Sequence, residues 1–272
     1  MDDAHLIALA ERLQGVGGVV AVVLGGSRAR GTHRPDSDYD VGLYYRGALD
    51  LAALGALAAG YGDAPVELTA PGGWGPWVDG GGWFTVGGVR VDWIYRDLDR
   101  VRRIWHDCQR GTYEVGTQAG YALGFYSHIY AGEIATCRAL SDPTGEVSAL
   151  HRAARAYPRA LGDALVNGLW QAGFALYGVR AGAAGDDPTL AAGHLFSAIG
   201  VMCHALHGRA GAWLVHEKGM VASAARLAIT PPGFADEAHG LLASVGRTRA
   251  ELTATADRAQ ALLERVQAAC GA

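Results

Sequence analysis

The sequence lacks the features that mark several large classes of protein. Its four cysteines, Cys108, Cys137, Cys203 and Cys270, lie far apart and form no Cys-x-x-Cys pair, which argues against a zinc site. No window approaches about 18 uninterrupted apolar residues, the length of a membrane span. The N-terminus has no basic segment followed by an apolar stretch, as a secretory signal would. We therefore expect incidental or buried thiols and a soluble, cytoplasmic protein with no membrane partner.

Charge is also scarce, and neither sign dominates. Asp, Glu, Lys and Arg make up 18% of the sequence, and the formal net charge is −4. Proteins that bind nucleic acid favour a basic face, because positive side chains neutralise the phosphates. The composition therefore disfavours a nucleic-acid partner and template-directed polymerisation. Half of the residues are hydrophobic, which is typical of a folded globular protein.

The pattern of apolar residues changes near residue 112. Before it, strands and helices alternate: strands are predicted at 19–24, 39–45 and 89–95, and helices at 3–14, 50–59 and 97–109. After it the strand signals stop. Ala/Leu-rich segments predict a bundle of five or six helices over 146–180, 189–208, 213–228 and 234–269. We predict an α+β protein with an α/β domain over 1–112, a helical domain over 113–272 and a cleft between them.

A glycine-rich turn follows the first predicted strand. The strand at 19–24 runs into Gly26 and Ser27, and a short helical turn is expected next. Glycine lets a phosphate approach the backbone N–H groups closely, and Ser27 adds a hydroxyl donor. Arg28 and Arg30 follow, and either side chain could reach phosphate oxygens. The turn therefore predicts a phosphate site.

Three aspartates lie on the second and third predicted strands. Asp38 and Asp40 are two residues apart, so both carboxylates are expected on one face of the strand. Two carboxylates side by side repel each other unless a cation lies between them, and Mg²⁺ prefers oxygen ligands together with substrate phosphates. Asp92 lies on the opposite face of its strand from Val91 and Trp93. Three carboxylates can hold two Mg²⁺ ions about 4 Å apart.

These residues carry a resemblance to a known family. Gly-Gly-Ser, the step from Ser27 to Asp38, Asp-x-Asp and a later strand aspartate, Asp92, resemble the DNA polymerase β-type nucleotidyltransferase superfamily. The whole chain resembles its small two-domain members, among them aminoglycoside and lincosamide nucleotidyltransferases. The resemblance implies an N-terminal α/β catalytic domain with a mixed sheet, followed by a helical domain that closes over nucleotide and acceptor. It implies a transferase of the EC 2.7.7 type.

A second segment extends the resemblance into the helical part. Glu217, Lys218 and the glycine after them resemble an Asn-Glu-Lys-Gly segment of relatives, with His216 in place of the Asn. The resemblance implies that Lys218 reaches the triphosphate. The sequence leaves open whether Glu217 contributes to the acceptor site, and a solvated surface lysine is the alternative for Lys218.

The resemblance also implies a mechanism, an in-line displacement at the α-phosphorus of an NTP. Asp92, nearest to the acceptor, takes or shares the proton of the attacking hydroxyl, and pyrophosphate leaves. The metal ligands for two Mg²⁺ ions are Asp38, Asp40 and Asp92. The groups expected to hold the β- and γ-phosphates are Gly26, Ser27, Arg30 and Lys218.

The acceptor is less well specified than the chemistry. The leading hypothesis is transfer of AMP to a hydroxyl of an aminoglycoside- or lincosamide-like antibiotic, an activity that would confer antibiotic resistance. The alternatives are adenylylation of a protein partner, as in antitoxin-like members, and a non-catalytic nucleotide-binding relative. The sequence does not specify the NTP base, the position of transfer or the oligomeric state. A homodimer is compatible with the resemblance, because relatives often complete their clefts across two chains.

Two further groups of residues keep two interpretations each. Trp74, Trp77 and Trp83, in and beside a Gly-rich stretch, could stack on a base or sugar, or close a small core beneath the loop. Asp186 and Asp187 precede a proline, so they could cap a helix or form an acidic patch for a cationic acceptor.

Overall fold

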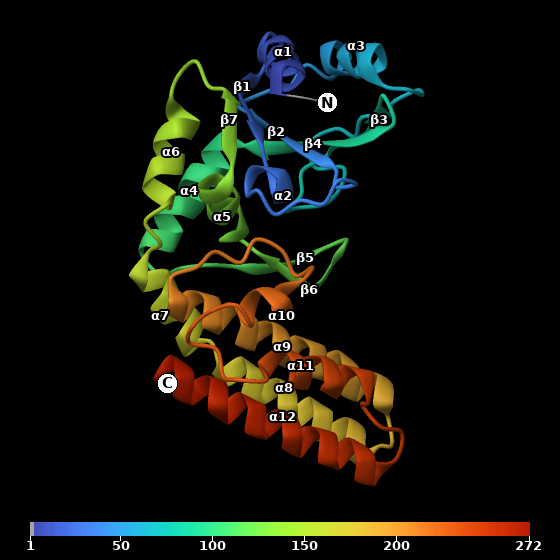
Figure 1. The fold of residues 1–272 in the computed structure, drawn as a ribbon, viewed down its shortest axis with the longest axis vertical. Helices are drawn as coiled ribbons and strands as arrows, with labels where there is room; N and C mark the ends of the chain where they lie inside the picture. Colours follow the sequence, from blue (N-terminus) through green and yellow to red (C-terminus); the bar gives the residue numbers. More distant parts are fainter. Residues whose placement is uncertain (1–2) are drawn as a thin grey trace. The chain divides into compact units, whose positions relative to one another are not determined.

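The computed structural model describes residues 3–272 and divides the chain into two compact units. The first unit comprises Met1–Asp107 and Tyr113–Ala156, and the second comprises Cys108–Thr112 and Tyr157–Ala272. The first unit contains the β-sheets and the second is helical (Figure 1). The predicted α+β class is therefore confirmed.

A five-stranded mixed sheet forms the centre of the first unit, with the strand order β3-β4-β2-β1-β7. Strands β2 and β4 run parallel, and every other neighbouring pair is antiparallel. The strands are β1 (Val19–Leu24), β2 (Tyr39–Tyr45), β3 (Gly81–Val86), β4 (Val89–Asp97) and β7 (Arg138–Ser141). The predicted strands at 19–24, 39–45 and 89–95 are confirmed.

Helices cover both faces of this sheet. Figure 1 shows α1 and α3 on one side of the sheet and α2 and α5 on the other. The core lies on the α1 and α3 side, where Val41, Trp93 and Tyr95 are fully buried. The alternation predicted for the third strand is confirmed, because Asp92 lies on the face opposite these core residues. The helices are α1 (Asp3–Gln14), α2 (Gly26–Ala29), α3 (Leu51–Tyr61), α4 (Leu98–Gln109), α5 (Ile129–Thr136) and α6 (Glu146–Ala154).

The structure corrects the expectation that strands end near residue 112. A hairpin of β5 (Val115–Gln118) and β6 (Tyr121–Tyr126) follows, and β7 pairs with β1 at the edge of the main sheet. Each is too short, or too rich in glycine and polar residues, to give a clear alternating pattern. The first unit therefore continues to Ala156 instead of ending at 112, and the predicted division into 1–112 and 113–272 does not match the compact units.

Six helices make up the second unit within the described residues, whereas the stretch from 146 to 269, for which five or six were predicted, contains seven because α6 of the first unit also lies in it. They are α7 (Arg159–Asn167), α8 (Trp170–Ala184), α9 (Pro188–Ala210), α10 (Met220–Ala224), α11 (Phe234–Ala243) and α12 (Arg249–Cys270). The helix expected over 213–228 is only the short α10. Gly219 precedes α10 in the left-handed conformation, which a continuous helix does not allow.

Helix α9 is the centre of the helical unit. It contacts α7, α8, α10, α11 and α12. By length and composition it is the one helix among residues 3–272 that could cross a membrane. Its apolar side chains, such as Leu195, Ile199 and Met202, are fully buried. Such burial is what the central helix of a bundle requires.

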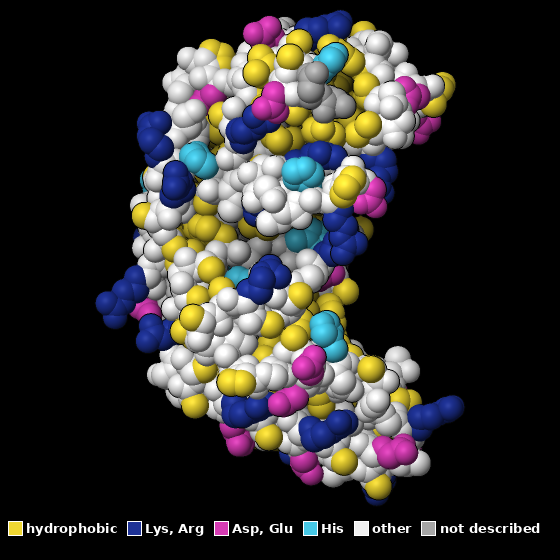
Figure 2. All heavy atoms as spheres, in the orientation of Figure 1, with side chains coloured by type: hydrophobic (Ala, Val, Ile, Leu, Met, Phe, Trp, Pro, Cys, Tyr) yellow, Lys and Arg dark blue, Asp and Glu magenta, His cyan; other side chains and the backbone are white. Residues whose placement is uncertain are grey.

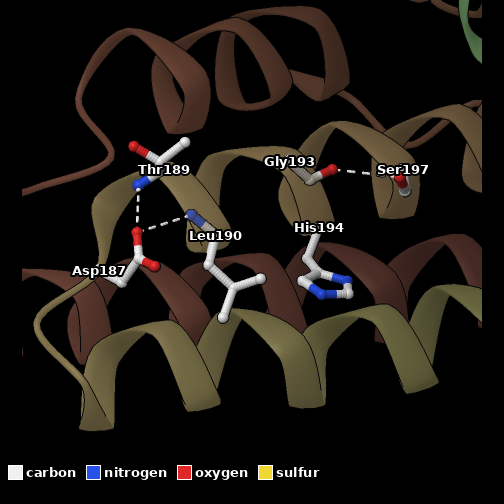
Figure 3. Close-up of a pocket in the computed structure, with 6 residues that line it drawn as sticks. All are labelled: Asp187, Thr189, Leu190, Gly193, His194 and Ser197. Carbon is white, nitrogen blue, oxygen red and sulfur yellow. Dashed lines mark hydrogen bonds between the residues drawn. The ribbon is translucent and has the colours of Figure 1, made fainter.

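The start of α9 shows how one acidic residue is used. The Asp187 carboxylate accepts hydrogen bonds from the backbone N–H groups of Thr189 and Leu190, both at 3.0 Å (Figure 3). Pro188 occupies the first turn, where its missing N–H has no partner to lose. The helix-cap interpretation of Asp187 is therefore confirmed.

Close approach of α7 and α9 depends on glycine and gives a stability prediction. A Cβ at Gly162 would lie 2.5 Å from the carbonyl oxygen of Gly208, so the two helix backbones would have to separate. We expect Gly162→Ala to lower the free energy of unfolding by about 2 kcal/mol in denaturant titrations. The matched control is Gly193→Ala on α9, where nothing lies within 4 Å. It should stabilise the protein by about 0.5–1 kcal/mol, since alanine favours helix; equal effects would refute this packing account.

Candidate active site

The strand register brings two of the three predicted metal ligands together. Asp40 on β2 is paired with Asp92 on β4 in the parallel ladder, so their side chains leave the same face of the sheet as neighbours. Asp38 lies one residue before β2 and not within it. It still interacts electrostatically with both other carboxylates. The predicted carboxylate group is thus assembled from two strands and the segment that leads into one of them.

Both paired carboxyls have raised pKa values. Burial raises the pKa of Asp40 to about 6, and the neighbouring charges of Asp38 and Glu133 act in the same direction. Burial likewise raises the pKa of Asp92 to about 6, with contributions from Asp40 and Asp38. Ionising these groups together costs free energy because like charges repel in a partly dehydrated place. A bound cation would remove that cost.

The glycine turn lies directly against this carboxylate pair. The N–H of Gly25 donates to the carbonyl oxygen of Asp40 at 2.7 Å, which joins the end of β1 to β2. Gly26 has φ +60, and a Cβ there would lie 1.6 Å from Oδ2 of Asp40. Only glycine therefore fits between the turn and the carboxylate. The predicted phosphate turn, Gly26 and Ser27, and the predicted metal ligand Asp40 belong to one site.

The Arg28 side chain holds the backbone of the site in place. Its guanidinium donates to the carbonyl oxygens of Ser37 (2.6 and 3.1 Å) and Asp38 (3.0 Å). It also lies 3.8 Å from the centre of the Tyr39 ring. These contacts hold the segment that carries Asp38 against the glycine turn. Of the two arginines that could have reached phosphate, Arg28 is already engaged by the protein.

Two further arginines lie near the carboxylates: Arg30 interacts electrostatically with Asp40, and Arg90 with Asp92. Arg30 is exposed at the end of α2 and interacts electrostatically with Asp40 and Glu133. A guanidinium can donate to phosphate oxygens, and the contact of Arg30 with a triphosphate stays a prediction. Arg90 on β4 donates to the carbonyl oxygen of Asp36 at 3.1 Å and so also holds the loop before β2.

Sequence reasoning missed a charged pair next to the site. Arg96 is buried on the Asp92 face of β4, and its guanidinium donates to both carboxylate oxygens of Glu133 at 2.7 Å. Such bidentate pairs are strong and directional. The pair fixes α5 to the sheet and places the Glu133 charge near Asp40. One feature of the sequence could have indicated this pair: Glu133 is the one charged residue of the mostly apolar helix α5.

The donor chemistry of the carboxylates fits a divalent cation. Carboxylate oxygens are the ligands that Mg²⁺ prefers, and repulsion between Asp40 and Asp92 is relieved by a positive ion. Among residues 3–272, no three His, Cys, Asp or Glu side chains already surround a common metal position. A Mg²⁺ ion would therefore be held by Asp40 and Asp92, with Asp38 and substrate oxygens completing its shell.

Lys218 belongs to the other unit. It is exposed in the turn before α10 rather than on a helix, and its backbone N–H donates to Nδ1 of His216 at 2.8 Å. The histidine that replaces the Asn of relatives thus shapes the turn. The contact of Lys218 with a triphosphate and any part for Glu217 in acceptor binding stay predictions.

Comparison with known proteins gives a family match over the N-terminal part of the chain. Residues 6–64 match the family model described as "Nucleotidyltransferase domain". The match includes the glycine turn, Asp38 and Asp40, and ends before Asp92. No curated protein matches the chain. Among solved structures, a nucleotidyltransferase-like protein from Exiguobacterium sibiricum 255-15 is similar, with 10% identity and a TM-score of 0.47, covering 96% of this chain and 74% of that one.

The N-terminal part of the chain therefore carries a nucleotidyltransferase domain of the DNA polymerase β type. A domain of this kind implies transfer of a nucleoside monophosphate from an NTP, and its family typically uses Mg²⁺.

Proposed function

We propose that the protein transfers AMP from ATP to a hydroxyl of a small molecule and releases pyrophosphate. The observation that carries this proposal is the pairing of Asp40 with Asp92 directly beside Gly26. A phosphate turn and a carboxylate pair in contact provide what nucleotidyl transfer needs: a place for the triphosphate and a place for Mg²⁺.

The proposed role of each residue follows from its place in the site. Gly26 and Ser27 at the turn would bind the β- and γ-phosphates, with Arg30 beside them as a cation. Asp38, Asp40 and Asp92 would hold Mg²⁺, which supplies positive charge for the phosphate oxygens when bound. Asp92, the carboxylate nearest to the acceptor, would accept the proton of its hydroxyl.

The acceptor that we propose is an aminoglycoside- or lincosamide-like antibiotic, so that the activity would confer resistance. This rests on the resemblance of the chain to small two-domain transferases and on its net charge of −4, which favours a cationic substrate. Lys and Arg side chains are interspersed with acidic ones on the face shown in Figure 2, which suits a small acceptor better than a nucleic acid. No separate observation favours adenylylation of a protein partner.

The direct test is acceptor-dependent release of pyrophosphate. Purified protein with Mg²⁺ would be assayed with each of the four NTPs against a panel of aminoglycosides and lincosamides. The proposal predicts release that requires one acceptor class, a product heavier by one nucleotide, and loss of both in Asp40→Asn. Nucleotide binding without release across the panel would contradict the proposed acceptor, and protein substrates would be tested next.

The raised carboxyl pKa values predict how Mg²⁺ binding depends on pH. Asp40 and Asp92 must lose their protons to bind the ion, and both titrate at about 6. We expect Mg²⁺ affinity, measured by calorimetry, to fall about tenfold per protonated carboxyl between pH 7 and pH 5. Binding at pH 6 should release protons, which calorimetry in buffers of different ionisation enthalpy detects. A pH-independent affinity over this range would contradict the assigned ligands.

A further inference from the structure

An exposed tryptophan is the direct neighbour of Asp92. In the antiparallel ladder between β3 and β4, Trp83 is paired with Asp92, so the two side chains leave the same face of the sheet. The next residue, Phe84, points the other way and packs edge-on against the buried Trp93, with ring centres 5.0 Å apart. Trp83 therefore does not contribute to the core beneath the sheet. It extends from the active-site face, next to the carboxylate assigned to the acceptor.

The Trp83 ring is held in a fixed orientation although it is exposed. It stacks on Trp74 with ring centres 4.1 Å apart and planes 8° from parallel. Trp74 covers one face of the indole, yet 65% of Trp83 remains exposed. Exposure of so large an apolar ring to water is unfavourable. Burial of the ring against a ligand would therefore gain hydrophobic free energy. A rigid, open aromatic face beside a reactive carboxylate is suited to stacking against a ligand.

Hydrogen bonds to the Gln118 side chain hold the loop that carries Trp74. Buried Gln118 of β5 donates to the carbonyl oxygen of Trp74 at 2.8 Å. Its side-chain oxygen accepts from the N–H groups of Trp77 and Val78, both at 3.0 Å. One buried amide thus fixes three backbone groups of the Gly-rich loop. Trp74 and Trp83 form a prepared platform, which lowers the entropy lost when a ligand binds.

The order of strands separates this platform from the phosphate turn. Across the sheet, β3, β4, β2 and β1 are consecutive neighbours. Gly26 follows β1 and touches Asp40 on β2, whereas Trp83 lies on β3 and adjoins Asp92 on β4. The carboxylate pair therefore lies between the phosphate turn and the indole. If the nucleotide is held by its phosphates at Gly26, the side of the carboxylate pair next to Trp83 is open to the acceptor.

We propose that Trp83 binds the acceptor and determines its class: the acceptor carries its hydroxyl on a ring with a flat face that stacks on the indole. A pyranose, through its C–H face, and an aromatic ring share this chemistry, whereas a flexible acyclic alcohol does not. The inference rests on the proposed function, because that function makes Asp92 the acceptor-side carboxylate. Trp83 acts on acceptor affinity and orientation and takes no proton.

The test compares matched tryptophan variants by ligand-observed NMR. Methyl glucoside, phenol and sorbitol would each be titrated into the full chain with Mg²⁺ and a non-hydrolysable ATP analogue, using wild type, Trp83→Ala and Trp83→Phe. The control is Trp170→Ala on α8, since Trp170 is 66% exposed and lies in the other unit. Affinity for the analogue would be measured separately for every variant.

We expect one or both ring compounds to bind more tightly than sorbitol and to weaken about tenfold in Trp83→Ala. Trp83→Phe should be intermediate and Trp170→Ala unchanged. Preference for methyl glucoside indicates that the acceptor ring is a pyranose, and preference for phenol indicates that it is aromatic. Equal binding of sorbitol, or ring binding that is absent or insensitive to Trp83, overturns the inference. Weaker binding of the ATP analogue alone in Trp83→Ala would also overturn it, because the indole would then serve the nucleotide.

The pyrophosphate assay keeps the two proposals separate. Trp83-dependent ring binding with no pyrophosphate release from any NTP would reject the proposed function and retain the platform. If pyrophosphate is released with an acceptor whose KM is the same in Trp83→Ala as in wild type, the proposed function is retained and the role of Trp83 is rejected. Under the inference, the KM of the acceptor rises about tenfold while kcat changes little.

Discussion

Asp40→Asn is expected to reduce turnover about a thousandfold or more while the protein remains folded. Asparagine keeps the shape of the side chain but removes the negative charge that would hold Mg²⁺ between β2 and β4. Asp40 is paired with Asp92 and touches the glycine turn, so its charge lies where the proposed Mg²⁺ and triphosphate would meet. Steady-state rates of pyrophosphate release, with circular dichroism to confirm folding, measure this effect.

The same substitution should raise stability when Mg²⁺ is absent. The pKa of Asp40 is about 6 in the folded protein, above the ordinary value of 3.8, so the folded state binds the proton more tightly than the unfolded state. The folded state therefore loses stability as pH rises from about 4 to 6, and the ionised carboxylate is destabilising at pH 7.5. Asp40→Asn should raise the Tm by about 2–4 °C at pH 7.5 and by little at pH 4.

Asp36→Asn is the matched control for charge. Asp36 is exposed two residues before Asp38, and it accepts a hydrogen bond from Arg90 through its backbone oxygen, which the substitution retains. We expect turnover and Tm close to wild type. Wild-type turnover in Asp40→Asn, or an equal loss in Asp36→Asn, would contradict the assigned metal ligands.

Gly26→Ala is expected to reduce turnover about a hundredfold or more. The new Cβ would occupy the position of the Asp40 carboxylate, 1.6 Å from Oδ2 and 2.6 Å from Cγ. The carboxylate would have to turn away from Asp92, and Mg²⁺ affinity should fall together with kcat. Calorimetric titration with Mg²⁺ and steady-state kinetics would measure the two effects.

Gly31→Ala separates this clash from backbone strain. Gly31 has φ +67, nearly the φ of Gly26, but nothing lies within 4 Å of its Cβ position. Alanine in the left-handed region costs about 1 kcal/mol at either position. We expect Gly31→Ala to lose that stability and keep near-normal kcat and Mg²⁺ affinity. Similar losses of activity in both variants would assign the effect to strain and not to contact with Asp40.

The sequence predicted the part of the fold that has strong periodicity. Strand β1 is a run of apolar and β-branched residues, β2 is mostly apolar, and alternation in β4 placed Asp92 opposite the core face. The register that pairs Asp40 with Asp92 was beyond sequence reasoning. It depends on which strands are neighbours, and β4 joins β2 although a long stretch of chain separates them.

Features without periodicity were missed or assigned to the wrong unit. Strand β7 is four residues long, and its place beside β1 is decided by an open sheet edge and not by its own composition. The Arg96–Glu133 pair joins β4 to α5, and no spacing rule connects the two residues. The stacking of Trp83 on Trp74 likewise depends on a loop held by Gln118, and no sequence pattern predicts that contact.

The most direct test of nucleotidyl transfer follows the label of the triphosphate. ATP labelled at the α-phosphate and ATP labelled at the γ-phosphate would be incubated separately with Mg²⁺, acceptor and protein, and the products resolved. The account predicts that the α-label moves to the acceptor and that the γ-label leaves in pyrophosphate, with neither event in Asp40→Asn. Transfer of the γ-label to the acceptor would show a phosphotransferase and contradict the account.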